Sequence, residues 1–161
     1  MVVISDTTCL SALFQVNELH ILQKLYKEII IPSKVFDELS ALSLFNIDIT
    51  PLSELEWLKI MNPTDNPQLQ HLLSILDEGE AHAIALMLEM KADLIILDDM
   101  EARQIATDYS LNIIGLGGVL ISAKSKGVIP QVKPLVDKII SISGFYLSSK
   151  IYHLILKTAG E

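Results

Sequence analysis

The sequence predicts an α/β fold in which a mostly parallel sheet is covered by helices on both faces. Three observations indicate this fold. Short apolar segments rich in β-branched residues recur along the chain, as buried parallel strands do. Segments with helical periodicity lie between them. Half of the 161 residues are hydrophobic, which is enough to build the core of one ordinary domain.

The predicted strands are short, and most end at a polar residue, a proline or a glycine. Val2–Ser5 is followed by an aspartate, and Glu28–Pro32 is closed by its proline. Leu94–Leu97 is wholly apolar, and Leu111–Ile114 leads into a glycine-containing segment. A further short strand is expected near Trp57–Met61. Strands of this kind, separated by helices, favour parallel pairing.

Helical patterns occupy the segments between these strands. The strongest begins at Glu78 or Glu80 and ends at Met90. Ser33 is expected to cap the helix after the second strand, and residues 62–67 are expected to form a loop. The other predicted helices cover about 10–25, 33–39, 100–109, 119–126, 132–142 and 148–158. The prediction is one domain over 1–161, with an α/β core over about 1–128 and a helical C-terminal extension over about 129–161.

The net charge of the chain is −8, from 12 basic and 20 acidic residues. The acids are concentrated in residues 1–108, whose net charge is −12, whereas residues 109–161 have a net charge of +4. An acidic surface repels a nucleic-acid backbone, unless bound metal ions reverse the local sign. The alternative interpretation is that these acids are solvated and maintain solubility.

Cys9 is the only cysteine, which excludes an internal disulfide and a thiolate metal cage. No apolar run approaches the roughly 18 residues that a membrane helix needs. The N-terminal residues lack the basic segment of a secretory signal. The sequence therefore predicts a cytoplasmic chain with no membrane partner.

Several carboxylates fall where an α/β sheet binds its ligands, outside the carboxyl ends of the strands. Asp6 follows the first strand, and Asp98 and Asp99 follow another. Glu80 lies in the first turn of a helix, and Glu38 lies one turn into another. Such a group would attract Mg²⁺ or Mn²⁺, which can promote phosphodiester hydrolysis. Taken singly, each acid could instead cap a helix or lie in solvent.

The acidic motifs resemble those of a PIN domain, the nuclease fold of prokaryotic toxin–antitoxin ribonucleases. The resemblance is carried by four segments in order, and it extends over nearly the whole chain. These segments are Val3–Thr8, Val35–Leu39, Leu76–Leu86 and Leu94–Arg103. The resemblance implies a Rossmann-like three-layer α/β/α sandwich with an acidic pocket that binds Mg²⁺ or Mn²⁺ and cuts RNA.

The resemblance also implies roles for individual residues. Asp6 corresponds to the first acid of the family pattern and Glu38 to the second. Glu80 stands where many members have Asp, and Asp99 stands where the last acid lies. Asp98 stands where a small polar residue is common, so either neighbouring aspartate could face the pocket as a metal ligand.

Two further residues are expected at the substrate. Thr8 matches a small hydroxyl residue that could bond the carboxylate of Asp6 or a water on the metal. Arg103 lies one helical turn after Asp99 and could meet a substrate phosphate. The alternative for Arg103 is an ordinary surface pair with Asp99.

The leading hypothesis is a metal-dependent endoribonuclease, of which a toxin-type PIN protein is one form. Its expected partners are an RNA substrate, an antitoxin protein and a second copy of the chain in a homodimer. One alternative is an inactive PIN fold that serves as a binding module. Another is a phosphoacceptor signalling domain, because the segment before Asp98 resembles the phosphorylation strand of receiver domains. The acidic pair that receivers place upstream is absent here.

Overall fold

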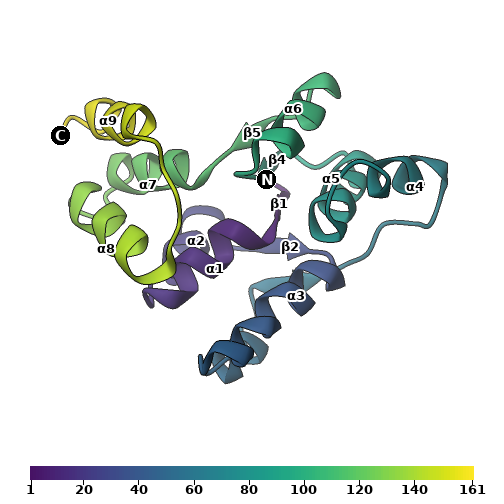
Figure 1. The fold of residues 1–161 in the computed structure, drawn as a ribbon, viewed down its shortest axis with the longest axis horizontal. Helices are drawn as coiled ribbons and strands as arrows, with labels where there is room; N and C mark the ends of the chain where they lie inside the picture. Colours follow the sequence, from purple (N-terminus) through teal and green to yellow (C-terminus); the bar gives the residue numbers. More distant parts are fainter.

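Five short parallel strands form the centre of the molecule (Figure 1). The computed structural model describes all of residues 1–161. The order of the strands across the sheet is β3-β2-β1-β4-β5. The strands are β1 (Val3–Ser5), β2 (Ile29–Ile31), β3 (Leu58–Ile60), β4 (Leu94–Ile96) and β5 (Ile113–Ile114). The predicted α/β class with a parallel sheet is confirmed.

Helices fill the connections between strands and form the C-terminal part of the chain. The α-helices are α1 (Thr7–Gln15), α2 (His20–Tyr26), α3 (Ser33–Ser40), α4 (Pro67–Leu73), α5 (Glu78–Met90), α6 (Met100–Asp108), α7 (Leu116–Ser125), α8 (Lys133–Ser143) and α9 (Ser149–Thr158). Two 3₁₀ helices, η1 (Ala41–Phe45) and η2 (Thr50–Glu54), follow α3. None of the helices is long and apolar enough to span a membrane.

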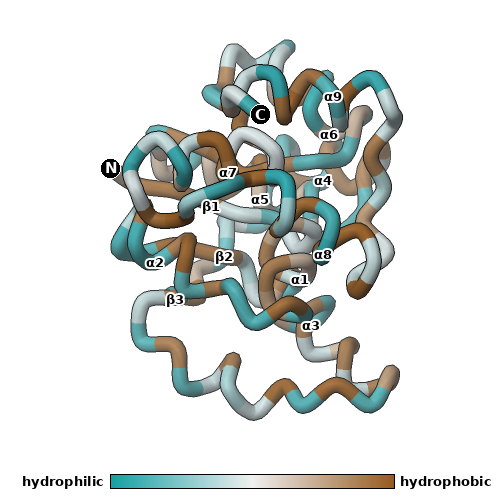
Figure 2. The backbone as a smooth tube through the Cα atoms, turned by 90° about the vertical axis from the view of Figure 1, so that its left-hand side faces the viewer, coloured by the Kyte–Doolittle hydropathy of each residue, from teal (hydrophilic) through white to brown (hydrophobic).

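Each face of the sheet carries its own hydrophobic core because side chains alternate along a strand. Val3, Ile29 and Ile31 join a core that also contains residues of α1, α2, α7, α8 and α9. Ile4 and Ile30 point to the opposite face, where α4, α5 and α6 cover them. Hydrophobic and hydrophilic residues alternate along these helices (Figure 2), as expected when one helix face is buried. The result is the predicted three-layer sandwich.

The position of the site follows from the order of the strands. The chain proceeds from β1 to β2 and β3 on one side, and then returns to add β4 and β5 on the other side of β1. Open α/β sheets bind ligands where the strand order reverses, outside the carboxyl ends. Here that point lies between β1 and β4, where Ser5 pairs with Ile96. Asp6 continues this pairing, because its N–H donates to the Ile96 carbonyl at 3.0 Å.

Two local predictions are wrong in detail, and one helix was not predicted. The predicted helix over 10–25 is two helices, because the chain turns between α1 and α2 with Asn17 in the left-handed region at φ 58°. Ser33 is the first residue of α3 and not its cap, and its hydroxyl donates to Asn62 Oδ1 at 2.9 Å. Helix α4 was not expected, and Asn66 caps it by accepting the Leu69 N–H at 2.9 Å.

The C-terminal helices are tied together by the side chain of Glu161. Its carboxylate accepts the backbone N–H groups of Val132 and Lys133, at 2.7 and 3.0 Å, next to the start of α8. It also accepts Lys124 Nζ of α7 at 2.9 Å. The Val132 N–H and the Lys124 ammonium lower the pKa of Glu161 from 4.5 to about 2. The ionised carboxylate therefore links α7, α8 and the residues after α9.

We expect Glu161→Gln to lower the melting temperature at pH 7 by a few degrees, because the amide loses the charge-assisted bonds. A lowered folded-state pKa contributes stability that is present above about pH 4.5 and is lost as the pH falls towards 2. The difference between wild type and variant should therefore shrink as the pH is lowered from 5 to 2. Thermal melts across this range measure it.

The matched control is Glu56→Gln, since Glu56 is exposed and lies outside this contact. If the Glu161 and Glu56 variants melt alike at every pH, the carboxylate of Glu161 does not stabilise this arrangement.

Candidate functional site

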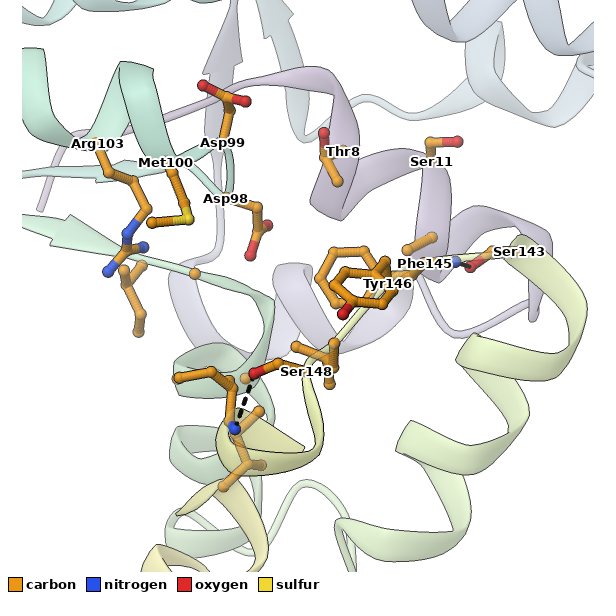
Figure 3. Close-up of a pocket in the computed structure, with 18 of the residues that line it drawn as sticks. Thr8, Ser11, Asp98, Asp99, Met100, Arg103, Ser143, Phe145, Tyr146 and Ser148 are labelled. Carbon is orange, nitrogen blue, oxygen red and sulfur yellow. Dashed lines mark hydrogen bonds between the residues drawn. The ribbon is translucent and has the colours of Figure 1, made fainter. Parts of the chain in front are cut away.

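A cleft of about 1230 Å³ opens at the carboxyl edge of the sheet (Figure 3). One side is formed by residues of α1, including Thr8, and another by Asp98 and Asp99 between β4 and α6. The segment from Ser143 to Ser148, which joins α8 to α9, forms a further wall. The cleft therefore lies between β1 and β4, where the strand order reverses, and the C-terminal helices form part of its wall.

Asp6 directly precedes Thr7 and Thr8 of the cleft wall but does not line the cleft itself, and it is only 2% exposed. It occupies the residue before α1, yet its side chain makes no capping bond, and Oδ1 has no hydrogen-bond partner. Burial raises the pKa of Asp6 well above its ordinary value, and the charges of Asp98 and Glu80 raise it further. The Thr8 backbone amide opposes this shift, and Glu38 adds a smaller increase in the pKa. The structure thus brings these carboxylates within electrostatic reach of one another.

Asp98 is the inner of the two neighbouring aspartates. Its Oδ1 accepts the Leu116 N–H at 2.9 Å, and its Oδ2 is buried without a partner. Burial raises the pKa of Asp98, while the Leu116 bond and the Arg103 charge lower it. Gly115 allows this close approach, because a Cβ there would lie 2.8 Å from Asp98 Oδ1. Asp98 is therefore held beside Asp6 with one carboxylate oxygen unpaired.

Asp99 has a different environment one residue later. It is exposed, and it caps α6 by accepting the Ala102 N–H at 2.9 Å. It also lines the cleft close to Glu80. Burial raises the pKa of Glu80 to about 7, and the charges of Asp99 and Asp77 contribute to the increase. Asp99 is therefore a helix cap, as the alternative interpretation expected. Its carboxylate also adds negative charge to the outer part of the site.

Glu38 is held by two groups that the sequence did not single out. The Thr7 hydroxyl donates to Oε2 of Glu38, and the Gly79 N–H donates to Oε1 at 3.1 Å. A Cβ at residue 79 would lie 2.5 Å from that oxygen, so a larger residue there would displace the Glu38 carboxylate. A glycine inside the first turn of α5, where it weakens the helix, was the signal available in the sequence. Glu38 does not line the cleft itself.

The two expected substrate residues line the cleft, but their contacts differ from the expectation. The Thr8 hydroxyl makes no bond to the Asp6 carboxylate, and Thr7 is the threonine that bonds an acid. Arg103 forms no ion pair with Asp99. It donates Nη1 to the Leu97 carbonyl at 2.7 Å and lies close enough to Asp98 to lower the pKa of that carboxyl.

The chemistry of these donors fits a hard divalent cation. Two buried carboxylate oxygens, Asp6 Oδ1 and Asp98 Oδ2, lack partners at the same edge of the sheet, and buried polar atoms normally have one. No three acidic, histidine or cysteine side chains lie close enough to enclose an ion by themselves. Mg²⁺ is commonly held by only one or two carboxylates, together with waters and substrate phosphates. The residues present therefore fit a site in which Asp6 and Asp98 would hold the cation together with water and substrate phosphate.

A family model described as DUF3368, a PIN domain, matches residues 2–161. Among solved structures, the chain is similar to a PilT N-terminus domain protein, SSO1118, from the hyperthermophilic archaeon Sulfolobus solfataricus P2. The two share 18% sequence identity with a TM-score of 0.50, over 76% of this chain and 93% of the other, which shows a common fold. No curated protein sequence matches the chain. The family match spans nearly every residue and confirms the predicted resemblance, and the chain belongs to the PIN-domain family.

Proposed function

We propose that this chain is a metal-dependent endoribonuclease whose centre is formed by Asp6 and Asp98. The observation that carries the proposal is the pair of buried, unpartnered carboxylate oxygens at the point where the strand order reverses. Membership of the PIN family supports it, because PIN domains are commonly nucleases that use divalent metals. The cleft beside the pair gives room for a polynucleotide strand.

Asp6 and Asp98 would hold Mg²⁺ or Mn²⁺, with Glu80 and Asp99 on the outer side of the site. The bound cation would promote attack of water on phosphorus and offset the charge of the phosphate. Leu116 keeps Asp98 in place through its N–H, so that one carboxylate oxygen stays available.

Arg103 would contact the substrate, and Glu38 would help to position the acids of the site. Arg103 uses one guanidinium N–H for the Leu97 carbonyl, and its remaining donors could reach a phosphate in the cleft. Glu38 is a positioning residue, because Thr7 and Gly79 hold its carboxylate. Its charge acts on Asp6 and Glu80, whose pKa values it raises.

We expect the purified protein to cleave single-stranded RNA in Mg²⁺ or Mn²⁺, leaving 5′-phosphate ends. Asp6→Asn should reduce the rate by at least about 100-fold, because loss of a preorganised charge at a reaction centre typically has this effect. The control is Asp37→Asn, the same change at an exposed residue of α3 outside the cleft. Cleavage of a labelled oligonucleotide, with circular dichroism to check folding, provides the measurement.

Equal cleavage by wild type and Asp6→Asn would assign the activity to another site or to a contaminant. If the wild-type protein binds metal but neither it nor any variant cleaves RNA, the result favours the alternative, an inactive binding module. The predicted antitoxin and homodimer rest on the family resemblance alone, and sedimentation of the purified chain tests the second of these.

The raised pKa of Glu80, about 7 in the folded protein, predicts a pH-dependent stability. The protonated carboxyl favours folding below about pH 4.5, and this contribution is lost as the pH rises through about 7. Glu80→Gln removes the effect in metal-free protein. Because solvent screens this half-exposed group, we expect the variant to be more stable than wild type at pH 8 by about 1 kcal/mol, or about 2–4 °C in Tm.

Melts in chelator from pH 4.5 to 8 make this comparison, with Glu54→Gln as the control at an exposed acid of η2. A Glu80 variant whose stability follows the wild-type pH profile would show that the acids do not interact as described.

Metal binding should also be visible without catalysis. Millimolar Mn²⁺ should raise the Tm of wild type, since a ligand that binds only the folded state stabilises it by mass action. Asp6→Asn should respond much less, because it removes one of the two unpartnered carboxylates. If Asp6 were only a structural residue at the start of α1, wild type and variant would show the same response to the metal.

A further inference from the structure

The segment between α8 and α9 is held firmly at both ends. Gly144 ends α8 in the left-handed region, at φ +70°, which glycine adopts without strain. Phe145 and Leu147 both pack against the larger hydrophobic core. Ser148 then caps α9 by accepting the Ile151 N–H at 3.2 Å. Any side chain that this segment directs outwards is therefore presented from a fixed backbone.

Tyr146 is that side chain. It lies between the two packed residues Phe145 and Leu147, it is 83% exposed, and it lines the same cleft as Asp98 (Figure 3). Its hydroxyl makes no hydrogen bond, whereas the hydroxyl of Tyr152 donates to Asp137 at 2.6 Å. An aromatic ring that is exposed on a rigid wall of a cleft, with no partner in the chain, is available to a ligand, and tyrosine is enriched where proteins bind partners.

The charge of this wall indicates the class of ligand. The wall belongs to the basic part of the chain, residues 109–161, whose net charge is +4. Lys150 lines the cleft beside it and forms no ion pair within the chain. The aspartates lie on the other side of the cleft. A flat ring next to an unpaired cation suits a ligand with both a planar apolar group and a negative charge, which a nucleotide of a single strand provides.

We infer that Tyr146 stacks on an unpaired base of the RNA substrate while Lys150 contacts a neighbouring phosphate. This inference rests on the proposed ribonuclease function and deepens it. Stacking on this wall would hold the strand across the cleft, so that a phosphodiester faces Asp6 and Asp98. A base inside a duplex is already stacked on both faces, so a ring at this position selects a single strand, and the proposed function makes that strand RNA. Because every base has a π-face, this position should tolerate all four bases.

The test combines Tyr146 variants with single abasic sites in the RNA. Binding of a labelled 10-nucleotide RNA is measured by fluorescence anisotropy in Ca²⁺, and KM and kcat are measured by cleavage in Mn²⁺. Tyr146→Ala should weaken binding on the order of tenfold and raise KM, with kcat little changed. Tyr146→Phe should restore binding, because the ring and not the hydroxyl makes the contact. Phe45→Ala is the control, since Phe45 is 74% exposed on η1 and lies outside the cleft.

The abasic scan gives a readout that a structural role would not alter. In wild type, one abasic position should weaken binding by the same factor as Tyr146→Ala. In the Tyr146→Ala variant, the same abasic position should cause no further loss of binding affinity.

The inference is overturned if the losses of affinity from Tyr146→Ala and from the abasic position add together. It is also overturned if Tyr146→Phe fails to restore binding, or if Tyr146→Ala binds as tightly as wild type. If wild type cleaves RNA and Tyr146→Ala matches it in KM, only this inference fails. If wild type neither binds nor cleaves RNA, the proposed function fails together with it.

Discussion

The parallel pairing of β1 with β4 is the constraint on which the site depends. Ser5 lies opposite Ile96, and the Asp6 N–H extends the pairing by one residue to the Ile96 carbonyl. This register brings the residues that follow both strands to one edge of the sheet. The backbone pairing alone therefore places Asp6 near Asp98. A shift of β4 by one residue would turn the side chains of that strand to the opposite face of the sheet and move Asp98 away from its place opposite Asp6. Gly115 completes the arrangement, because a Cβ there would lie 2.8 Å from Asp98 Oδ1 and displace the carboxylate.

Gathering carboxylates in this way opposes folding. A buried carboxylate loses its hydration, and its like-charged neighbours disfavour ionisation further. Both effects raise the pKa of Asp6, and burial raises that of Asp98 as well. The net stability of a domain is only about 5–15 kcal/mol, so this cost has to be offset elsewhere. The two hydrophobic cores on opposite faces of the sheet supply the offset, and most of their members are aliphatic. A bound cation would lower the cost further by pairing with the charges.

The sheet and the placement of acids after strands were predictable because both depend on local pattern. Apolar runs and the polar residue that ends each of them are visible in the sequence itself. What could not be predicted depends on contacts between distant residues. Thr7 and Gly79 bond Glu38, which lies more than thirty residues from either. The sequence also left open which of two adjacent aspartates faces inward. That depends on where α6 begins, since its first turn takes the second of them as its cap.

The cleft combines two parts of the chain with opposite charge. The acids come from the first 108 residues, and the wall that carries Tyr146 and Lys150 comes from the remainder. The acidic side repels a phosphate backbone unless a cation intervenes, whereas Lys150 on the other wall attracts it with or without metal. A strand would therefore be held on the C-terminal wall and would approach the aspartates only where the cation offsets their charge. If Tyr146 and Lys150 bind the strand as proposed, the junction of α8 and α9 forms part of the substrate site, because Phe145 at this junction packs against the core and fixes the wall opposite Asp98.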